Sequence, residues 1–387
     1  MIKKVIITFL ATFLKTFNKE EKKIVYHSFP DFSDNSFAVF IYISNNFTNY
    51  LNIWLVDDYS EINKYEKLVS NYTQNLSYKI VKKKSPLGLF HYLTSNIIFY
   101  THGIFDFIGL IPGQKKTNLW HGMPIKNIGL LNGTKVPVSD YYVVTSAFYQ
   151  DIISGAFGVD KNKVLIGGQT RNDFLVDSDI SINKLFDNKI IYKQTILWMP
   201  TYRKSTIPGM KGIDGNINPS LDFLCSDSLI KVNEILIKTE SFCFIKIHPM
   251  DVMKVSDFNN YSNIKIVDNS DFDRKGVTMH SIFNSIDVLL TDFSSIYIDF
   301  LLLNKPIGFV FSDYDEFKNS RGFIFSEPKK YMPGEIITCL DKLENFLIKT
   351  ILNDIDDFTE HREKVKTLFH EFDKDFSKTI AEKILNE

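Results

Sequence analysis

Four short polar motifs that each follow an apolar run contain the residue types best suited to chemistry. In the first, the run Val288–Leu290 precedes Asp292, Ser294 and Ser295, and apolar residues recur at helical spacing from Ile296 onward. Unpaired N–H groups at a helix start, together with serine hydroxyls, can donate hydrogen bonds to a phosphate. The sequence therefore predicts a phosphate site here, although simple capping of the helix by a serine is the alternative.

Two further motifs carry basic side chains at the ends of predicted strands. Arg203 follows the run 195–199 and can bind two phosphate oxygens at once. Lys246 and His248 lie on the same side of a predicted strand, where burying two basic groups is costly without an anion. Solvent-facing positions are the alternative for all three residues. Together with the serines, they predict an anion site large enough for a pyrophosphate.

The remaining motif is Trp120-His121-Gly122, which follows another predicted strand. A histidine can act as a general base near neutral pH, and Gly122 permits the close approach of a ligand or of another backbone. A structural histidine that bonds a backbone carbonyl is the alternative. A base on one side of a cleft and an anion site on the other suit transfer from an activated phosphate donor to a hydroxyl.

Sequence motifs typical of several other enzyme classes are absent. The sequence contains no Walker A loop, no G-x-G-x-x-G fingerprint and no G-x-S-x-G elbow. Asp271-Phe272-Asp273 is interpreted as a solvated loop and not as a metal ligand set, and no metal cofactor is expected. Three cysteines without metal-ligand spacing are typical of a reducing cytoplasm, and a net charge of −1 argues against nucleic acid as a partner.

Predicted strands alternate with predicted helices from Lys22 onward, a pattern typical of a parallel α/β sheet. A chain of 387 residues is expected to form two domains with a cleft between them. In such sheets ligands bind beyond the carboxyl ends of the strands, where the four motifs lie. We expect a membrane-associating segment over residues 1–20, an acceptor-side domain over 21–180 and a donor domain over 181–350. Residues 351–387 are expected to form C-terminal helices, for which packing back on the N-terminal domain is one option.

Residues 1–17 are apolar but too short and too interrupted to span a bilayer, and no signal-peptide cleavage site follows them. As a helix, this segment would place Lys4, Lys15 and Lys19 on one face and apolar side chains on the rest. Such a helix can lie in the membrane interface with its lysines on anionic headgroups. A terminal helix packed on its own domain or on a partner is the alternative.

Seven motifs in order resemble those of the CDP-glycerol glycerophosphotransferase family, the teichoic acid primases and polymerases. They extend from about Val25 to about Ile337 and read SFPDFSDNSFAVFIYI, NLWHGMPIKNIG, SDYYVVTS with GQTRNDFL, WMPTYRK, IKIHPMD, LLTDFSSIYIDFLLLNKPI and SRGFIFSEPKKYMPGEI. The resemblance implies a GT-B-like fold, in which two Rossmann-like domains face a cleft and the C-terminal one holds the CDP part of the donor.

The resemblance also implies roles for single residues. His121 corresponds to the base that deprotonates the acceptor hydroxyl, and His248 is implied to hold the donor phosphates together with Ser294 and Ser295. Arg321 matches a basic position after the donor site. The hydroxyl would attack the β-phosphorus of CDP-glycerol or CDP-ribitol and release CMP, in teichoic acid or capsule-type polymer synthesis.

The family further implies peripheral attachment to the cytoplasmic face of the cell membrane, where lipid-linked or polymeric acceptors lie. This favours the interfacial interpretation of residues 1–17. Two alternatives stay open at this point: a GT-B glycosyltransferase that uses a nucleotide sugar, and a non-catalytic, membrane-bound scaffold. The motifs select neither the alditol nor the acceptor, and they are silent on the oligomeric state.

Overall fold

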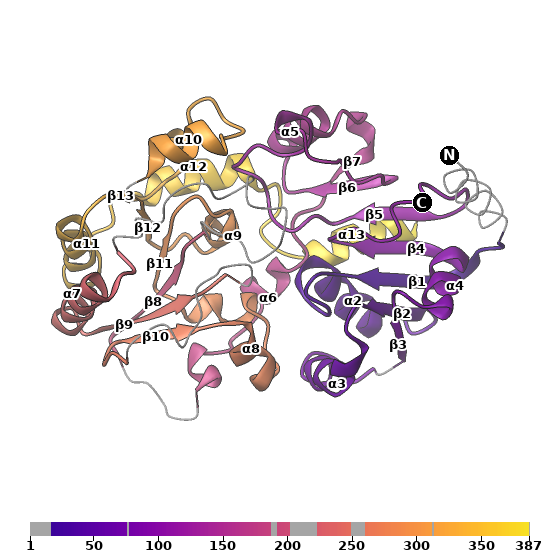
Figure 1. Cartoon of the computed structure of the whole chain (residues 1–387), viewed down its shortest axis with the longest axis horizontal. Coiled ribbons are helices and arrows are strands. Elements are labelled where there is room, and N and C mark those ends of the chain that lie inside the picture. Colours follow the sequence, from indigo (N-terminus) through magenta and orange to yellow (C-terminus); the bar gives the residue numbers. More distant parts are fainter. Residues whose placement is uncertain are drawn as a thin grey trace.

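The computed structural model describes residues 17–75, 77–186, 192–201, 223–248, 260–311 and 313–386, which form two α/β lobes side by side (Figure 1). Two sequence-based predictions lie outside these residues: the phosphate-binding role of Arg203 and, except for Phe17, the N-terminal helix over residues 1–17. Among the described residues, no helix has the length and apolar character needed to cross a bilayer.

The N-terminal lobe is built on a parallel sheet with the strand order β3-β2-β1-β4-β5-β6-β7. Its central strands are apolar and almost wholly buried, as expected for a parallel sheet covered on both faces. The strands are β1 (Glu20–His27), β2 (Leu51–Val56), β3 (Tyr78–Lys82), β4 (Ser95–Tyr100), β5 (Lys115–Asn118), β6 (Tyr141–Val144) and β7 (Val164–Ile166).

The C-terminal lobe repeats this plan with a second parallel sheet, in the order β10-β9-β8-β11-β12-β13. Both sheets therefore reverse direction beside their first strand, the switch point where doubly wound folds bind ligands. The last strand was not predicted because it has three residues and lies at the sheet edge. The strands are β8 (Gln194–Met199), β9 (Ser241–Lys246), β10 (Ile264–Val267), β11 (Val288–Thr291), β12 (Ile307–Val310) and β13 (Glu335–Ile337).

Helices cover both sheets. Those of the first lobe are α2 (Asp34–Asn46), α3 (Ile62–Ser70), α4 (Pro86–Thr94), α5 (Ala147–Phe157) and α6 (Asn172–Val176). Those that follow are α7 (Ser226–Lys238), α8 (Asn269–Lys275), α9 (Ile296–Phe300), α10 (Tyr314–Ser320), α11 (Leu340–Leu347), α12 (Thr359–Phe369) and α13 (Phe376–Leu385).

Helix α8 corrects one prediction. Asp271-Phe272-Asp273 is not a solvated loop, because Asp268 and Asp271 form a capping box and Phe272 is buried in the core of the lobe. The acidic and polar residues of this segment are typical of a loop, but here they form a two-turn helix whose cap uses the acidic side chains.

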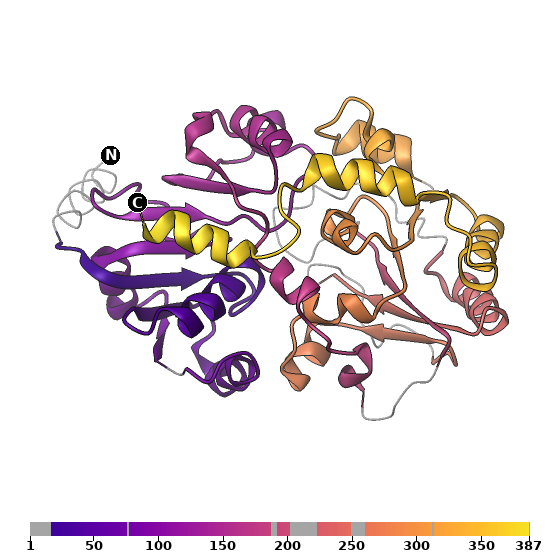
Figure 2. The same cartoon turned by 180° about the vertical axis from the view of Figure 1, so that it is seen from behind.

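The two C-terminal helices extend across both lobes, as Figure 2 shows from behind. Helix α12 packs on the C-terminal lobe and on α5, where Phe369 stacks with Phe148 and contacts Tyr149. Helix α13 returns to the N-terminal lobe and packs on α2, and its Lys383 donates to the carbonyl of Ile166. The start of α13 also contacts the crossover between β7 and β8, because the N–H groups of Phe376 and Ser377 donate to Asp173 of α6.

Candidate active site

A cavity of about 810 Å³ lies between the lobes and is lined by side chains of both. Five residues singled out from the sequence line it together: His121 from the N-terminal lobe, and Lys246, His248, Ser294 and Ser295 from the C-terminal lobe. Each lies at or shortly after the carboxyl end of a strand, so the facing of these two edges creates the cavity.

His121 is held between two rings and remains open to the cavity. Its imidazole stacks on Trp120, with ring centroids 4.5 Å apart, and on His102, at 4.6 Å. Trp120 has a φ of +57°, a conformation that side chains rarely adopt, and its backbone is held by Asn118 and Asn35. This turn directs the ring of His121 away from the sheet and toward the cavity.

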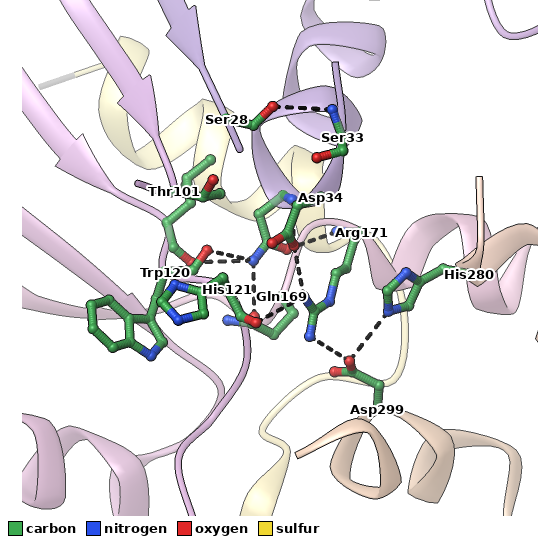
Figure 3. Close-up of polar contacts among 12 residues, drawn as sticks. Ser28, Ser33, Asp34, Thr101, Trp120, His121, Gln169, Arg171, His280 and Asp299 are labelled. Carbon is green, nitrogen blue, oxygen red and sulfur yellow. Dashed lines mark hydrogen bonds and ion pairs between the residues drawn. The ribbon is translucent and has the colours of Figure 1, made fainter. Parts of the chain in front are cut away.

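Behind His121 lies a chain of ionic contacts that joins the lobes (Figure 3). Arg171 donates to Asp34 at 2.7 Å, to the backbone carbonyl of His121 at 3.0 Å and to Asp299 at 2.6 Å. Asp34 begins α2 and Asp299 lies on α9, so the guanidinium bridges the two lobes. His280 Nε2 lies 3.3 Å from the Asp299 carboxylate. We call Asp34, Arg171 and Asp299 the interlobe bridge.

Burial and charge act against each other at this site. Burial lowers the pKa of His121, Arg171 lowers it further, and Asp34 together with a hydrogen bond to the Thr101 carbonyl counteracts them. The imidazole is therefore neutral near pH 7 and able to accept a proton. Burial alone would raise the pKa values of Asp34 and Asp299, but Arg171 holds both below their usual range.

Lys246 is the buried cation of the opposite wall. Only 4% of its surface is exposed, and its Nζ donates to Asn269 at 2.6 Å and to the Ile247 carbonyl at 3.0 Å. Burial lowers the pKa of Lys246 to about 8, against the opposing influence of Asp268 and other nearby carboxylates. An anion in the cavity would restore the charge balance that burial disturbs.

The two serines lie at the start of α9, which has five residues. Ser295 is its N-cap residue but makes no side-chain cap bond, whereas Ser294 Oγ accepts weakly from the N–H of Ile296 at 3.4 Å. Gly122 of the other lobe packs directly against this segment, because a Cβ built on it would lie 2.7 Å from Ser295 Oγ. Glycine therefore lets the Trp120-His121-Gly122 motif approach the serine motif across the cavity.

The comparisons with known proteins agree with this geometry. A sequence profile of the family described as CDP-Glycerol:Poly(glycerophosphate) glycerophosphotransferase matches residues 8–386. The chain belongs to this family. It is accordingly a transferase of the CDP-glycerol glycerophosphotransferase type, and the glycosyltransferase alternative is not favoured.

Named relatives include wall polymer enzymes. The chain is 26% identical over 291 residues to a teichoic acid glycerol-phosphate transferase of Staphylococcus aureus, a match that covers 69% of this chain and 68% of the relative. It is 26% identical over 327 residues to a teichoic acid poly(ribitol-phosphate) polymerase of Bacillus spizizenii, covering 77% of this chain and 47% of the polymerase. This glycerophosphotransferase chain thus spans about half of the larger relative.

The solved structure of the wall teichoic acid polymerase TagF has the same fold. It superimposes with a TM-score of 0.73 at 19% sequence identity, over 100% of this chain and 98% of that one. The GT-B-like arrangement of two Rossmann-like domains predicted from the sequence is confirmed.

Three other predicted residues of this family member lie outside the cavity lining or outside the described residues. Asp292 is 2% exposed and accepts from the backbone and hydroxyl of Thr201, which joins the ends of β8 and β11. Arg321 donates to the Asn127 carbonyl at 2.5 Å, so it contacts the loop that follows the His121 motif. Arg203 is not described. Roles of Arg203 and Arg321 toward a donor stay predictions.

The N-terminal wall contains one group of possible metal ligands among the described residues, His27, Asp31 and Asp57. The ammonium of Lys83 lies 2.9 Å from His27 Nε2 and 2.5 Å from the Asp57 carboxylate. A cation is thus already supplied by the chain at this position. The expectation that no metal cofactor takes part remains a prediction.

The interlobe bridge was not predicted from the sequence. Asp34, Arg171 and Asp299 all lie in motifs that carried the family resemblance, SFPDFSDNSF, GQTRNDF and LLTDFSSIYIDF, but nothing in their spacing pairs residues more than a hundred positions apart. A buried charge next to an apolar helical pattern, as at Asp299, is the one signal that could have indicated a partner.

Proposed function

We propose that the chain transfers an alditol phosphate, with glycerol phosphate as the first choice, from a CDP-alditol to a hydroxyl of a membrane-linked or polymeric acceptor. CMP is the leaving group. The main observation in support is that a single cavity is lined by His121 of one lobe and by Lys246, His248, Ser294 and Ser295 of the other. Family membership supports the donor class, and the wall-polymer relatives support the acceptor class.

In the proposed reaction, the acceptor hydroxyl gives its proton to the neutral imidazole of His121. Its oxygen then attacks the β-phosphorus of the donor, a new P–O bond forms, and the bond to the CMP phosphate breaks. His121 suits this task because burial lowers its pKa and stacking on Trp120 and His102 fixes its ring. Positioning and charge stabilisation supply most of the rate in phosphoryl transfer.

The opposite wall stabilises the charge that builds up on the leaving CMP. Lys246 lies at the end of a buried strand, and the serines at the start of α9 line the same cavity. His248 completes this side of the cavity and is proposed to bind the donor phosphates. Fixed donors of this kind stabilise charge without reorganising during the reaction.

One assay tests the reaction class. The purified protein is incubated with labelled CDP-glycerol, CDP-ribitol or a UDP-sugar and a lipid-linked acceptor, with and without EDTA. We expect transfer of the alditol together with its phosphate, release of CMP, and activity that survives EDTA. Transfer of a sugar without phosphate would overturn the proposal, and inhibition by EDTA would overturn its metal-free form.

Two substitutions separate the roles of the walls. His121→Ala is expected to lower kcat at least ~10³-fold, because general-base catalysis contributes ~10²–10⁴-fold, while the Kd of the donor is unchanged. His248→Ala is expected to weaken donor binding or transfer. Binding is measured by calorimetry with CDP-glycerol. Wild-type turnover by His121→Ala would exclude the base assignment and would favour a non-catalytic scaffold.

We further propose that the enzyme works peripherally on the cytoplasmic face of the membrane, attached through its N-terminal segment. The lysines and apolar residues of positions 1–17 support this proposal. Deletion of residues 1–17 should move the protein to the soluble fraction in cell fractionation, with full activity on a water-soluble acceptor. Retention of the truncated protein on membranes would exclude this segment as the attachment.

A further inference from the structure

The ion pair between Arg171 and Asp299 in the interlobe bridge is deeply buried, unlike an ion pair at the surface. Arg171 is 6% exposed and Asp299 is 1% exposed, and the guanidinium is shared between carboxylates of two lobes. Asn172 donates to the second Asp299 oxygen at 3.2 Å. The Nε of Arg171 is buried without a hydrogen-bond partner, so the guanidinium makes its contacts through its two Nη atoms.

The same guanidinium also fixes the main chain of the candidate base. Its Nη1 binds the His121 carbonyl at 3.0 Å, and its Nη2 lies 3.2 Å from where a Cβ on Gly122 would be. Asp299 lies on α9, the helix that begins directly after Ser294 and Ser295. One side chain therefore touches the His121 segment at one end and the serine helix at the other.

Stability alone is a weak reason for such a bridge. Replacing a buried ion pair with packed apolar residues of similar size is often neutral or stabilising, because desolvation offsets the attraction between the charges. Apolar packing between Phe148, Tyr149 and Phe369 already joins the lobes elsewhere. What the ion pair adds is a fixed geometry, since a guanidinium binds carboxylates in one plane and at fixed angles.

We propose that Arg171 and Asp299 are positioning residues for transfer, which hold His121 at a set distance from the donor-binding serines across the cavity. This inference rests on the proposed function, because it assigns a task to the base of that reaction. Asp34 and Arg171 also line the cavity, but in this role the bridge acts through the His121 segment and α9. It sets the distance and orientation of His121 relative to the phosphate site.

The decisive variant is Asp299→Asn, which keeps the shape of the side chain and leaves Arg171 paired with Asp34. We expect kcat to fall about 10–10²-fold, as for a misplacement of about 1 Å, with the calorimetric Kd of CDP-glycerol unchanged within about twofold. Arg171→Lys should act in the same direction, because an ammonium cannot reproduce the planar contacts. Circular dichroism and thermal melting establish that each variant is folded.

Lys67→Ala is the matched control. Lys67 on α3 donates to the Arg274 carbonyl of the other lobe at 2.8 Å, in an exposed contact whose two residues are not among those that line the cavity. The Lys67→Ala substitution removes an interlobe hydrogen bond but changes no contact of His121 or α9, so kcat should stay within about twofold of wild type. An equal loss in Lys67→Ala and Asp299→Asn would show that any interlobe contact matters, and it would overturn the specific role of the bridge.

The pH profile provides a readout that a purely structural role would not move. The charged and titratable groups that face His121 are Asp34 on α2, Arg171 before α6 and His102 after β4. Asp34→Asn removes an anion and should move the acidic limb of kcat/KM to lower pH. Arg171→Gln removes a cation and should move it to higher pH. Shifts of the same sign, or none, would show that Asp34 and Arg171 do not lie against His121 in the working enzyme, and would overturn the proposal.

Different results would contradict the proposed function and the positioning role of the bridge. Absence of glycerol phosphate transfer by the unaltered protein would contradict the proposed function. Full kcat in a folded Asp299→Asn protein, alongside an active wild type and an inactive His121→Ala, would contradict only the positioning role. A loss in Asp299→Asn that appears in the donor Kd and leaves kcat intact would also contradict it.

Discussion

The carboxyl edges of the two sheets face one cavity, but their polar side chains are arranged differently. On the N-terminal edge, the functional groups bind one another: His121 stacks between two rings, and Arg171 holds Asp34 and the His121 carbonyl. On the C-terminal edge, Lys246 bonds a neighbouring amide and a carbonyl, and Ser295 makes no cap bond.

This difference indicates a division of work between two sheets that share one strand order, to which the N-terminal sheet adds a seventh strand. A base must already be in place when the acceptor arrives, so its surroundings hold it rigidly. A phosphate site gains its missing contacts from the ligand, and it can leave donors available until then. The fold places both edges, while the side chains decide which edge does which task.

Among the tests of this comparison, the largest effect should come from a substitution that forces the two edges apart. In Gly122→Ala, the new Cβ would lie 2.7 Å from Ser295 Oγ, and the φ of +132° is unfavourable for alanine. We expect kcat to fall about 10²-fold and the free energy of unfolding to drop by about 1–3 kcal/mol. Transfer kinetics and urea unfolding measure the two effects.

Gly133→Ala separates strain from the clash. Gly133 has a φ of +70° with nothing within 4 Å of its built Cβ, so alanine there meets strain but no neighbour. It should lose stability and keep its kcat. If Gly133→Ala lost as much activity as Gly122→Ala, the close approach of the two motifs would not be the cause.

An intermediate effect should appear in the pH dependence of donor binding. Because burial lowers the pKa of Lys246 to about 8, its ammonium is charged below pH 8 and is lost as the pH rises. The Kd of CDP-glycerol should therefore rise between pH 7.5 and 9.5, by at most about tenfold per pH unit. Calorimetry at several pH values measures this change.

Lys246→Arg provides the comparison, since a guanidinium stays charged over this range. Its donor Kd should be flat from pH 7.5 to 9.5, even if the absolute affinity is lower. Lys246→Met should bind weakly at every pH. A flat wild-type profile would place the anion contact elsewhere on the C-terminal edge.

The last effect concerns acid stability and not transfer, and it should originate in the N-terminal edge. Burial lowers the pKa of His102 to about 3 and also lowers that of His27. The unfolded chain binds these protons near pH 6.5, so stability is complete above that pH and falls as the pH drops toward 4. The slope is at most about 1.4 kcal/mol per pH unit for each group.

Urea unfolding at pH 7, 6 and 5 tests this prediction. His102→Asn should reduce the loss of stability between pH 7 and 5, because one of the two titrating groups is gone. His361→Asn, on the outer helix α12, should leave that loss as in the wild type. An unchanged pH dependence in His102→Asn would assign the acid sensitivity to other groups.

Much of the fold could be predicted because its signals are local. Apolar runs such as Val288–Leu290 and helical spacing such as that after Ile296 depend on neighbouring residues, and both elements are present as strand β11 and helix α9. The polar residues that follow the strands were also predictable, since parallel sheets bring them to one edge. Strand β13 was too short for this reasoning, and the helix over Asp271 and Asp273 was hidden by its own capping residues.

By itself, the sequence determined the residue types at each strand end and therefore the kind of chemistry: a histidine in one half, and a lysine, a histidine and two serines in the other. Only the tertiary structure decided that Gly122 meets Ser295 and that Arg171 joins Asp34 to Asp299. The physical reason is that burial and charge pairing depend on distance in space. Partners separated by more than a hundred residues leave no periodic pattern along the chain.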